Sequence, residues 1–346
     1  MTAKISWYRT PIDRHKLREL TKRSDTKGLL HAGAFLLIYA GSIVANTYFA
    51  VNGLWVALAV GSYLHATFSG FLGMAASVHE LSHGTAFKSK WLNEAFYRIF
   101  AFLSWNSYVH FRESHGYHHN YTYYKRYDWE QRSNPIPFST TDVISWFLFD
   151  YKKFKQLMWT NINHAFGNTD VDFFFWCPLL ERSDVKTRSL VTWARVLLIG
   201  HLLLVALFIY FELYILIFLV TFSAFFATFL EHSTGIVQHM GLRGDVPDWR
   251  VNSYTVDFGP IMRFLYWNMN YHTEHHMYAA VPFYNLPKLR KEIGWDLQKP
   301  LPGLLPALRH INWVKRKQSE DPEFRYMPEF PASATPPKLP DADAAG

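Results

Sequence analysis

The feature that most constrains this chain is the long stretch from Gly28 to Phe87, in which Glu80 is the only residue with a formal charge. Within it, residues 29–50 and 54–78 are predominantly apolar. As helices, each is long enough to cross a hydrocarbon core of about 30 Å. Only the short segment VNG separates them. The sequence therefore predicts two membrane-spanning helices joined as a hairpin.

A second apolar pair occupies residues 190–211 and 213–230, which meet at Glu212. Four spans in two hairpins predict an all-α integral membrane protein. Lys and Arg are absent from both hairpin turns and crowd the N-terminus and the polar regions. By the positive-inside rule, the polar regions 79–189 and 231–326 share the cytoplasmic side, where they are expected to form a helical cap.

The predicted membrane domain covers residues 29–326 and has a polar segment at each end. Residues 1–28 are basic and expected in the cytoplasm, and residues 327–346, rich in Pro and Ala, are predicted to be disordered. The net charge is +7, but the basic residues form no dense patch with a nucleic-acid motif, so no nucleic-acid partner is expected. The single cysteine, Cys177, excludes an intramolecular disulfide and a cluster held by several cysteines.

The segment VHELSHGTAF, residues 78–87, contains the first of three histidine motifs. His79 and His83 flank Glu80 in an HExxH pattern, which in a zinc protease binds the metal and supplies the glutamate as general base. The same spacing also places two imidazoles on one helical face within a larger metal site. By itself this motif leaves both alternatives open.

Two further motifs share an HxxHH pattern and favour the larger metal site. Their histidines are His115, His118, His119, His272, His275 and His276. Positions i, i+3 and i+4 lie on one face of a helix, so the three imidazoles of each motif can converge on metal. Two such triplets arise by chance in about one chain in a thousand of this composition.

The predicted topology brings all eight motif histidines to one side of the bilayer. His79 falls where the second span ends, the first triplet lies in the central polar region, and the second triplet follows the fourth span. His239, shortly after the fourth span, is a ninth candidate. One zinc needs three or four ligands, whereas eight or nine neutral imidazoles fit two metal ions with positions left open for dioxygen and water.

These motifs resemble those of the membrane fatty acid desaturase superfamily, which includes lipid hydroxylases. The segment NYHTEHHMYAAVPFYNLPKL, residues 270–289, resembles the acyl-lipid desaturase pattern, and HELSHGTAF and FRESHGYHHNYT resemble the first two histidine motifs of the family. The resemblance implies two iron ions, dioxygen as co-substrate, and no catalytic residue separate from the metal ligands. The implied ligands are His79, His83, His115, His118, His119, His239, His272, His275 and His276.

The implied reaction is oxygen-dependent oxidation of an unactivated C–H bond in a lipophilic substrate. Desaturation of a fatty acyl chain or lipid is the favoured prediction, and hydroxylation of an alkane, carotenoid or other lipid is the alternative. The HExxH zinc protease is a remote alternative, because it leaves the six histidines of the HxxHH motifs without a role.

The electrons for such a reaction are expected to come from a separate protein, because the sequence has no HPGG, multi-cysteine or GxGxxG motif. A ferredoxin, rubredoxin or cytochrome b5-like donor with an acidic surface would complement the basic cytoplasmic face. We expect a multi-pass protein of a bacterial inner membrane with its active site on the cytoplasmic side. The sequence leaves open the substrate, the regiochemistry, the oligomeric state and the roles of Glu80, His65 and His232.

Overall fold

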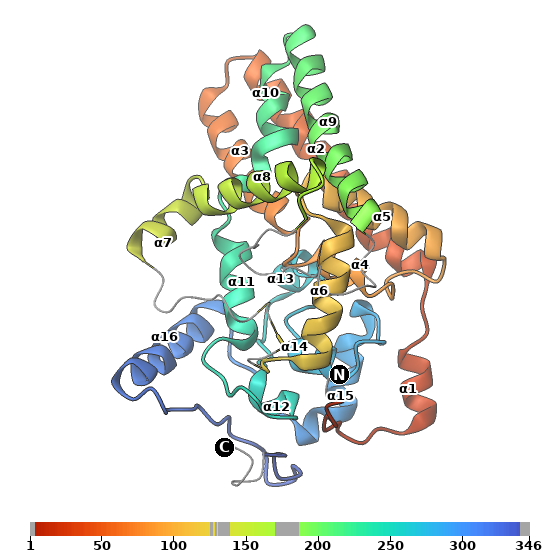
Figure 1. Cartoon of the computed structure of the whole chain (residues 1–346), viewed down its shortest axis with the longest axis vertical. Coiled ribbons are helices and arrows are strands. Elements are labelled where there is room, and N and C mark those ends of the chain that lie inside the picture. Colours follow the sequence, from red (N-terminus) through yellow and green to blue (C-terminus); the bar gives the residue numbers. More distant parts are fainter. Residues whose placement is uncertain (1–3, 125–126, 129, 131–138, 170–186, 340–346) are drawn as a thin grey trace. The chain divides into compact units, whose positions relative to one another are not determined.

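The computed structural model describes all residues except 1–3, 125–126, 129, 131–138, 170–186 and 340–346 (Figure 1). Cys177 lies outside the described residues. Over the described part, the chain is helical and contains no β-strand, as the sequence predicts.

The chain divides into two compact units. Unit 1 comprises Met1–Arg23, His115–Pro137 and Ser233–Gly346, and unit 2 comprises Ser24–Ser114 and Phe138–His232. Two helices, α6 (Tyr108–Tyr121) and α11 (Phe229–His239), begin in unit 2 and end in unit 1.

Unit 2 contains the apolar helices. Their bounds are α2 (Asp25–Val51), α3 (Trp55–Gly70), α4 (Ser77–Ser82), α5 (Lys90–Leu103), α7 (Thr140–Phe147), α8 (Tyr151–Ala165), α9 (Thr187–Tyr210) and α10 (Tyr214–Leu216), followed by a π-helix (Ile217–Phe222) and a 3₁₀-helix (Ser223–Phe225). Helix α2 packs against α3, and α9 packs against α8 and the π-helix. In Figure 1, α2, α3, α9 and α10 run side by side.

Two helices, α2 and α9, are long and apolar enough to cross a membrane by length and composition. They coincide with the predicted spans 29–50 and 190–211. The predicted span 54–78 is shorter than expected, because α3 ends at Gly70 and the Ser77 hydroxyl donates to the Phe71 carbonyl at 2.9 Å within the turns that follow. The fourth predicted span, 213–230, is divided among α10, the π-helix and the 3₁₀-helix. The structure therefore shows two of the four predicted spans as candidate membrane helices, and the four-span layout stays a prediction.

Large apolar side chains on these helices face outward from unit 2. Leu37 on α2 is 75% exposed, Val56 on α3 is 81% exposed, and Leu202 on α9 is 69% exposed. Exposed apolar surface on adjacent helices is typical of contact with lipid. The outer surface of these helices is thus suited to a hydrocarbon environment.

His65, in the middle of α3, is buried and bonded to neighbouring segments of unit 2. Its Nε2 lies 2.8 Å from the Leu219 carbonyl, which can only accept, and its Nδ1 lies 2.7 Å from the Ser42 hydroxyl. Both ring nitrogens therefore have partners, and the side chain ties α3 to α2 and to the π-helix.

Unit 1 consists of short helices connected by loops. Their bounds are α1 (Arg14–Leu20), α12 (Trp249–Asn252), α13 (Pro260–Leu265), α14 (His272–Met277), α15 (Leu286–Ile293) and α16 (Leu304–Glu320), with 3₁₀-helices at Phe283–Asn285 and Gly294–Asp296. Pro260 and Pro287 stand in the first turns of α13 and α15, where a missing N–H costs no helical hydrogen bond.

A buried guanidinium organises unit 1 beneath its C-terminal segment. Arg250 is fully buried and pairs with Asp248 at 2.7 Å and with Asp296 at 2.8 Å. The C-terminal segment, predicted to be disordered, has little regular structure over 327–339 but contacts this cluster. The backbone N–H of Thr335 donates to Asp296 at 2.7 Å, and that of Lys338 donates to Asp248 at 3.0 Å. Both bonds satisfy carboxylate lone pairs of the buried cluster. The composition of the C-terminal segment does not predict these contacts.

Candidate metal centre

Three short segments of unit 1 position the candidate ligands, and helical periodicity explains how two of them do so. The C-terminal half of α6 carries one HxxHH motif, α14 carries the other, and α11 ends at His239. On each HxxHH helix, residues i, i+3 and i+4 share a face. Helix α14 begins directly at His272, and the N–H of His275 donates to the Tyr271 carbonyl at 2.9 Å, so the motif forms the helix itself.

Four buried imidazoles of unit 1 form one candidate site. The ligand atoms of His118, His239, His272 and His276 all lie within 4.8 Å of one another. Nε2 of His272 lies 2.7 Å from Nε2 of His239 and 3.0 Å from Nε2 of His276. Each of these four side chains is at most 2% exposed. Nitrogens gathered in this way could hold a metal ion.

The outer nitrogens of three of these rings have partners that fix their orientation. Nδ1 of His118 lies 2.9 Å from a carboxylate oxygen of Asp128, and Nδ1 of His239 lies 2.7 Å from the Asn252 carbonyl. Both partners can only accept, so each Nδ1 carries a proton. Nδ1 of His276 lies 3.2 Å from the Thr122 hydroxyl. That hydroxyl already donates its proton to the His118 carbonyl at 2.7 Å, so Nδ1 of His276 is also the donor.

These hydrogen bonds at Nδ1 indicate whether the four imidazoles can bind a metal ion. In a neutral imidazole with a proton on Nδ1, Nε2 carries only a lone pair. Nε2 of His239 and Nε2 of His276 both face Nε2 of His272. That nitrogen carries at most one proton, so it can donate a hydrogen bond to only one of them. A cation among the Nε2 atoms could accept a lone pair from all three at once. Imidazoles oriented by a hydrogen bond at the other nitrogen are also typical of metal ligands. The residues therefore fit a metal ion.

The electrostatics of unit 1 favour positive charge at this position. Burial lowers the pKa of His118, but the carboxylates of Asp128 and Glu130 more than reverse this and bring its pKa to about 9. Burial raises the pKa of Glu130 to about 7. Burial also holds the pKa of His239 and of His276 well below the usual value, so both rings are neutral at pH 7. His118, with its raised pKa, must release a proton when a metal binds, because a ligating imidazole is neutral.

A second group in unit 1 contains His115, His119 and His275. Their ligand atoms also lie within 4.8 Å of one another, and Nε2 of His115 lies 3.1 Å from Nε2 of His119. Nδ1 of His115 donates to Glu130 at 3.1 Å, which repeats the carboxylate–imidazole arrangement seen at His118. Unit 1 thus gathers seven of the nine candidate ligands into two groups.

The remaining two candidates lie together in unit 2. The ligand atoms of His79 and His83 are within 4.8 Å of each other, at the end of α4. The ring of His79 lies 6.3 Å from that of Phe111. Glu80 is fully buried, and one of its oxygens accepts from the Thr85 hydroxyl at 2.7 Å. This bond connects Glu80 to the loop after α4.

His232, whose role the sequence leaves open, is engaged within unit 2. Its Nε2 donates to Asp150 at 2.6 Å, and its ring stacks on Trp146 with 4.4 Å between centroids. Asp150 also accepts from the Thr228 hydroxyl at 3.0 Å and caps α8 through the N–H of Lys153. His232 therefore joins α11 to the start of α8.

Sequence reasoning missed the residues that orient the ligands. Asp128 and Glu130 follow the first HxxHH motif in the segment YDWE, and acidic residues shortly after a histidine motif are the one signal that could have indicated them. Thr122 acts through its hydroxyl and Asn252 through its backbone carbonyl. A backbone carbonyl leaves no trace in the residue type, so that contact has no sequence signal.

The fold and the candidate site define a class of helical, membrane-associated proteins with histidine-rich sites. The model of the fatty acid desaturase family matches residues 53–304. The chain belongs to this family. Among curated proteins, no sequence matches the chain. Membership identifies a membrane-associated oxidoreductase and indicates that it oxidises fatty acyl chains.

Proposed function

We propose that this chain is a di-iron enzyme that uses dioxygen to desaturate a fatty acyl chain or lipid. The family supports fatty acyl oxidation, and the histidine groups are compatible with iron. The observation that carries the proposal is the buried group of four imidazoles, three of which are hydrogen-bonded at Nδ1 so that their Nε2 atoms converge with that of His272. Bound iron would supply the activation of dioxygen needed to remove hydrogen from an unactivated C–H bond.

In this proposal, His79 and His83 of unit 2 are iron ligands as well. Within unit 1, His115, His119 and His275 contribute to one iron site, and the group of four holds the other iron. Imidazole is a suitable ligand for iron, and nine of them leave positions open on two ions. Glu80 then acts as a supporting residue that holds Thr85, and no general base is required of it.

The balance of the reaction requires an electron donor. Desaturation breaks a C–H bond on each of two adjacent carbons and forms a C=C bond, and the two hydrogens contribute to reducing dioxygen to two waters. Two further electrons and two protons must be supplied from outside. We assign the electrons to a ferredoxin, rubredoxin or cytochrome b5-like protein that docks on a basic cytoplasmic face, in a bacterial inner membrane crossed by the two hairpins. An acidic donor surface would complement that charge.

Hydroxylation of an alkane, carotenoid or other lipid is the second candidate, since it starts with the same hydrogen abstraction and differs in the fate of the carbon radical. The third histidine motif, followed by VPFYNLPKL, favours desaturation. The HExxH zinc protease has little support, because it assigns no role to the buried group of His118, His239, His272 and His276.

The test is a comparison of lipids from cells that express the intact protein with lipids from cells that express His275→Ala. We expect a new carbon–carbon double bond, detected by mass spectrometry, that is lost in the variant by at least a hundredfold. The control is His15→Ala, which removes an exposed histidine from α1 in the same unit and should leave the product unchanged. A new hydroxyl would favour the second candidate, and unchanged lipids in both strains would contradict the proposal.

A further inference from the structure

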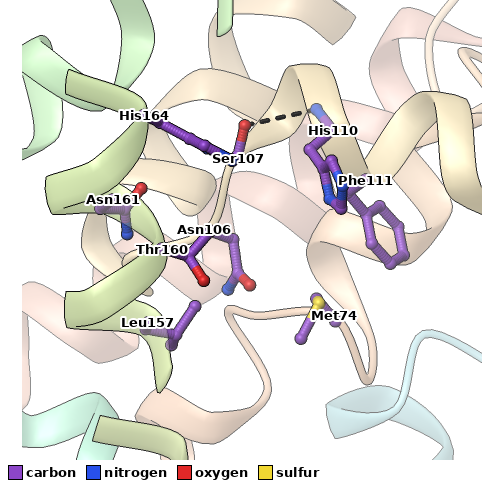
Figure 2. A pocket seen from close by; sticks show the side chains of 9 residues that line it. All are labelled: Met74, Asn106, Ser107, His110, Phe111, Leu157, Thr160, Asn161 and His164. Atoms are coloured by element: carbon purple, nitrogen blue, oxygen red, sulfur yellow. Dashed lines mark hydrogen bonds between the residues drawn. The ribbon is translucent and has the colours of Figure 1, made fainter. Parts of the chain in front are cut away.

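Unit 2 contains a pocket in which six of the nine lining residues have polar side chains. Its polar lining comes from Asn106, Ser107, His110, Thr160, Asn161 and His164. Helix α8 supplies the last three, the start of α6 supplies His110, and the loop between α5 and α6 supplies the first two (Figure 2). Leu157, Phe111 and Met74 form the apolar remainder. The pocket is therefore built from three separate segments of one unit.

Two polar atoms in this pocket lack partners. Thr160 is 6% exposed and His164 is 2% exposed, and neither Oγ1 of Thr160 nor Nδ1 of His164 has a hydrogen-bond partner among the described residues. In Figure 2 both side chains extend from α8 toward Asn106 and Ser107. A buried polar atom without a partner destabilises the fold. A ligand group that bonds to both atoms would remove this destabilisation.

The neighbouring amides are already held in place. Nδ2 of Asn106 donates to the Ser104 carbonyl at 3.0 Å, and Nδ2 of Asn161 donates to the Trp105 carbonyl at 3.2 Å. These bonds fix the orientation of both amide side chains. The two atoms without partners are thus available in a preformed site.

The pocket suits an uncharged group. Among the described residues that line it, none is Asp, Glu, Lys or Arg. Burial lowers the pKa of His164 to about 4, so its imidazole is neutral at pH 7. A carboxylate or phosphate would enter this pocket without a counter-charge, which is costly for a buried ion. A neutral imidazole and a hydroxyl, by contrast, can each donate or accept a hydrogen bond.

The pocket adjoins the candidate ligand His79 within unit 2. Phe111 lines the pocket, and its ring lies 6.3 Å from the ring of His79. One aromatic side chain therefore separates the pocket from that ligand. A group bound here would lie close to the carbon that is oxidised, rather than at the distant end of a long acyl chain.

We propose that this pocket binds an uncharged hydrogen-bonding group of the lipid substrate, a hydroxyl or an amide, through Thr160 and His164. The inference rests on the proposed function and narrows its substrate class. The substrate is a lipid with a neutral polar group near the reacting carbon, and a bare hydrocarbon or a free fatty acid binds less well. Thr160 and His164 position the substrate and take no part in hydrogen removal.

The test measures binding, which does not depend on turnover. The iron-loaded, full-length protein in detergent is titrated with three probes of equal chain length: an N-(2-hydroxyethyl) fatty amide, a long-chain alcohol and a saturated fatty acid. Thermal unfolding gives the apparent affinity for each probe. We expect the amide and the alcohol to bind more tightly than the fatty acid at pH 8, and comparison of the two shows which neutral group fits.

Two variants and a control complete the experiment. Thr160→Val removes the hydroxyl at similar volume and should weaken binding of the preferred probe by about fivefold, as should His164→Phe. Thr160→Val also removes a buried atom without a partner, so the variant should fold normally. Thr192→Val is the matched control, because its hydroxyl is exposed and bonds the Arg188 carbonyl on α9.

The outcomes separate this inference from the proposed function. Equal binding of all three probes, or unchanged binding in Thr160→Val and His164→Phe, would show that the pocket holds only water and would overturn the inference. Selective binding that the two variants weaken would support it. If lipid analysis shows no oxidised product while selective binding persists, the proposed function fails and the binding site remains.

Discussion

At the scale of single residues, the candidate centre depends on the hydrogen-bond partners that orient the imidazoles. The spacing of the histidines predicts which rings can share a helical face, and unit 1 indeed gathers seven of them. The spacing does not predict the carboxylates. Asp128 and Glu130 reach His118 and His115 only because the chain turns back after α6, and that turn has no periodic signal.

Asp128→Asn should weaken metal binding without removing a ligand. The amide keeps the size of the side chain but loses the charge that stabilises the Nδ1 proton of His118 and the positive charge of the metal. We expect the affinity for Fe²⁺ or Co²⁺ to fall by about 10- to 100-fold in a titration of the metal-free protein.

Asp257→Asn provides the comparison for that titration. Asp257 belongs to the same unit but is 65% exposed and pairs with Arg263 on the surface. This variant should bind metal as the wild type does. Equal affinities for the wild type and Asp128→Asn would show that the carboxylate has no role in the site.

At the scale of helices, the sequence predicts the first span of each hairpin better than the second. Residues 29–50 and 190–211 correspond to α2 and α9, because a long apolar run leaves few alternatives to a helix. The predicted span 54–78 ends early at Gly70, where glycine fits because an added Cβ would lie 3.1 Å from a Glu231 oxygen. A contact between residues so far apart in the sequence cannot be read from local composition.

Helix α16 gives a prediction for pH dependence. Lys315 is 8% exposed, and burial lowers its pKa from 10.5 to about 8. The unfolded chain therefore binds more protons than the folded one between about pH 8 and 10.5, and stability should rise with pH across this window. Lys315→Met should remove that rise and stabilise the protein at pH 7 by on the order of 3 kcal/mol.

Thermal unfolding in detergent at pH 7, 8.5 and 10 measures both effects. The exposed residue Lys317, on the same helix, provides the control, because Lys317→Met removes a surface pair with Glu320 and should change stability little. If the stability of the wild type does not change with pH, or if the rise persists in Lys315→Met, then Lys315 does not cause a pH-dependent stability.

At the scale of the whole molecule, the chain combines an apolar unit with a unit that gathers buried histidines. The sequence predicts both halves from independent signals, hydrophobic length for one and histidine spacing for the other. It does not predict the internal structure of unit 1, whose short helices are joined by loops and held by contacts such as the buried Arg250 pairs. Such pairs depend on tertiary packing.

The iron content of the purified protein shows whether the nine histidines hold two iron ions in separate groups. We predict two irons per chain in the wild type and in His15→Ala. The double variant His79→Ala, His83→Ala should keep one iron, because the group of His118, His239, His272 and His276 lies entirely within unit 1. A single zinc per chain, or loss of all metal in the double variant, would show that the chain does not hold two separate iron sites.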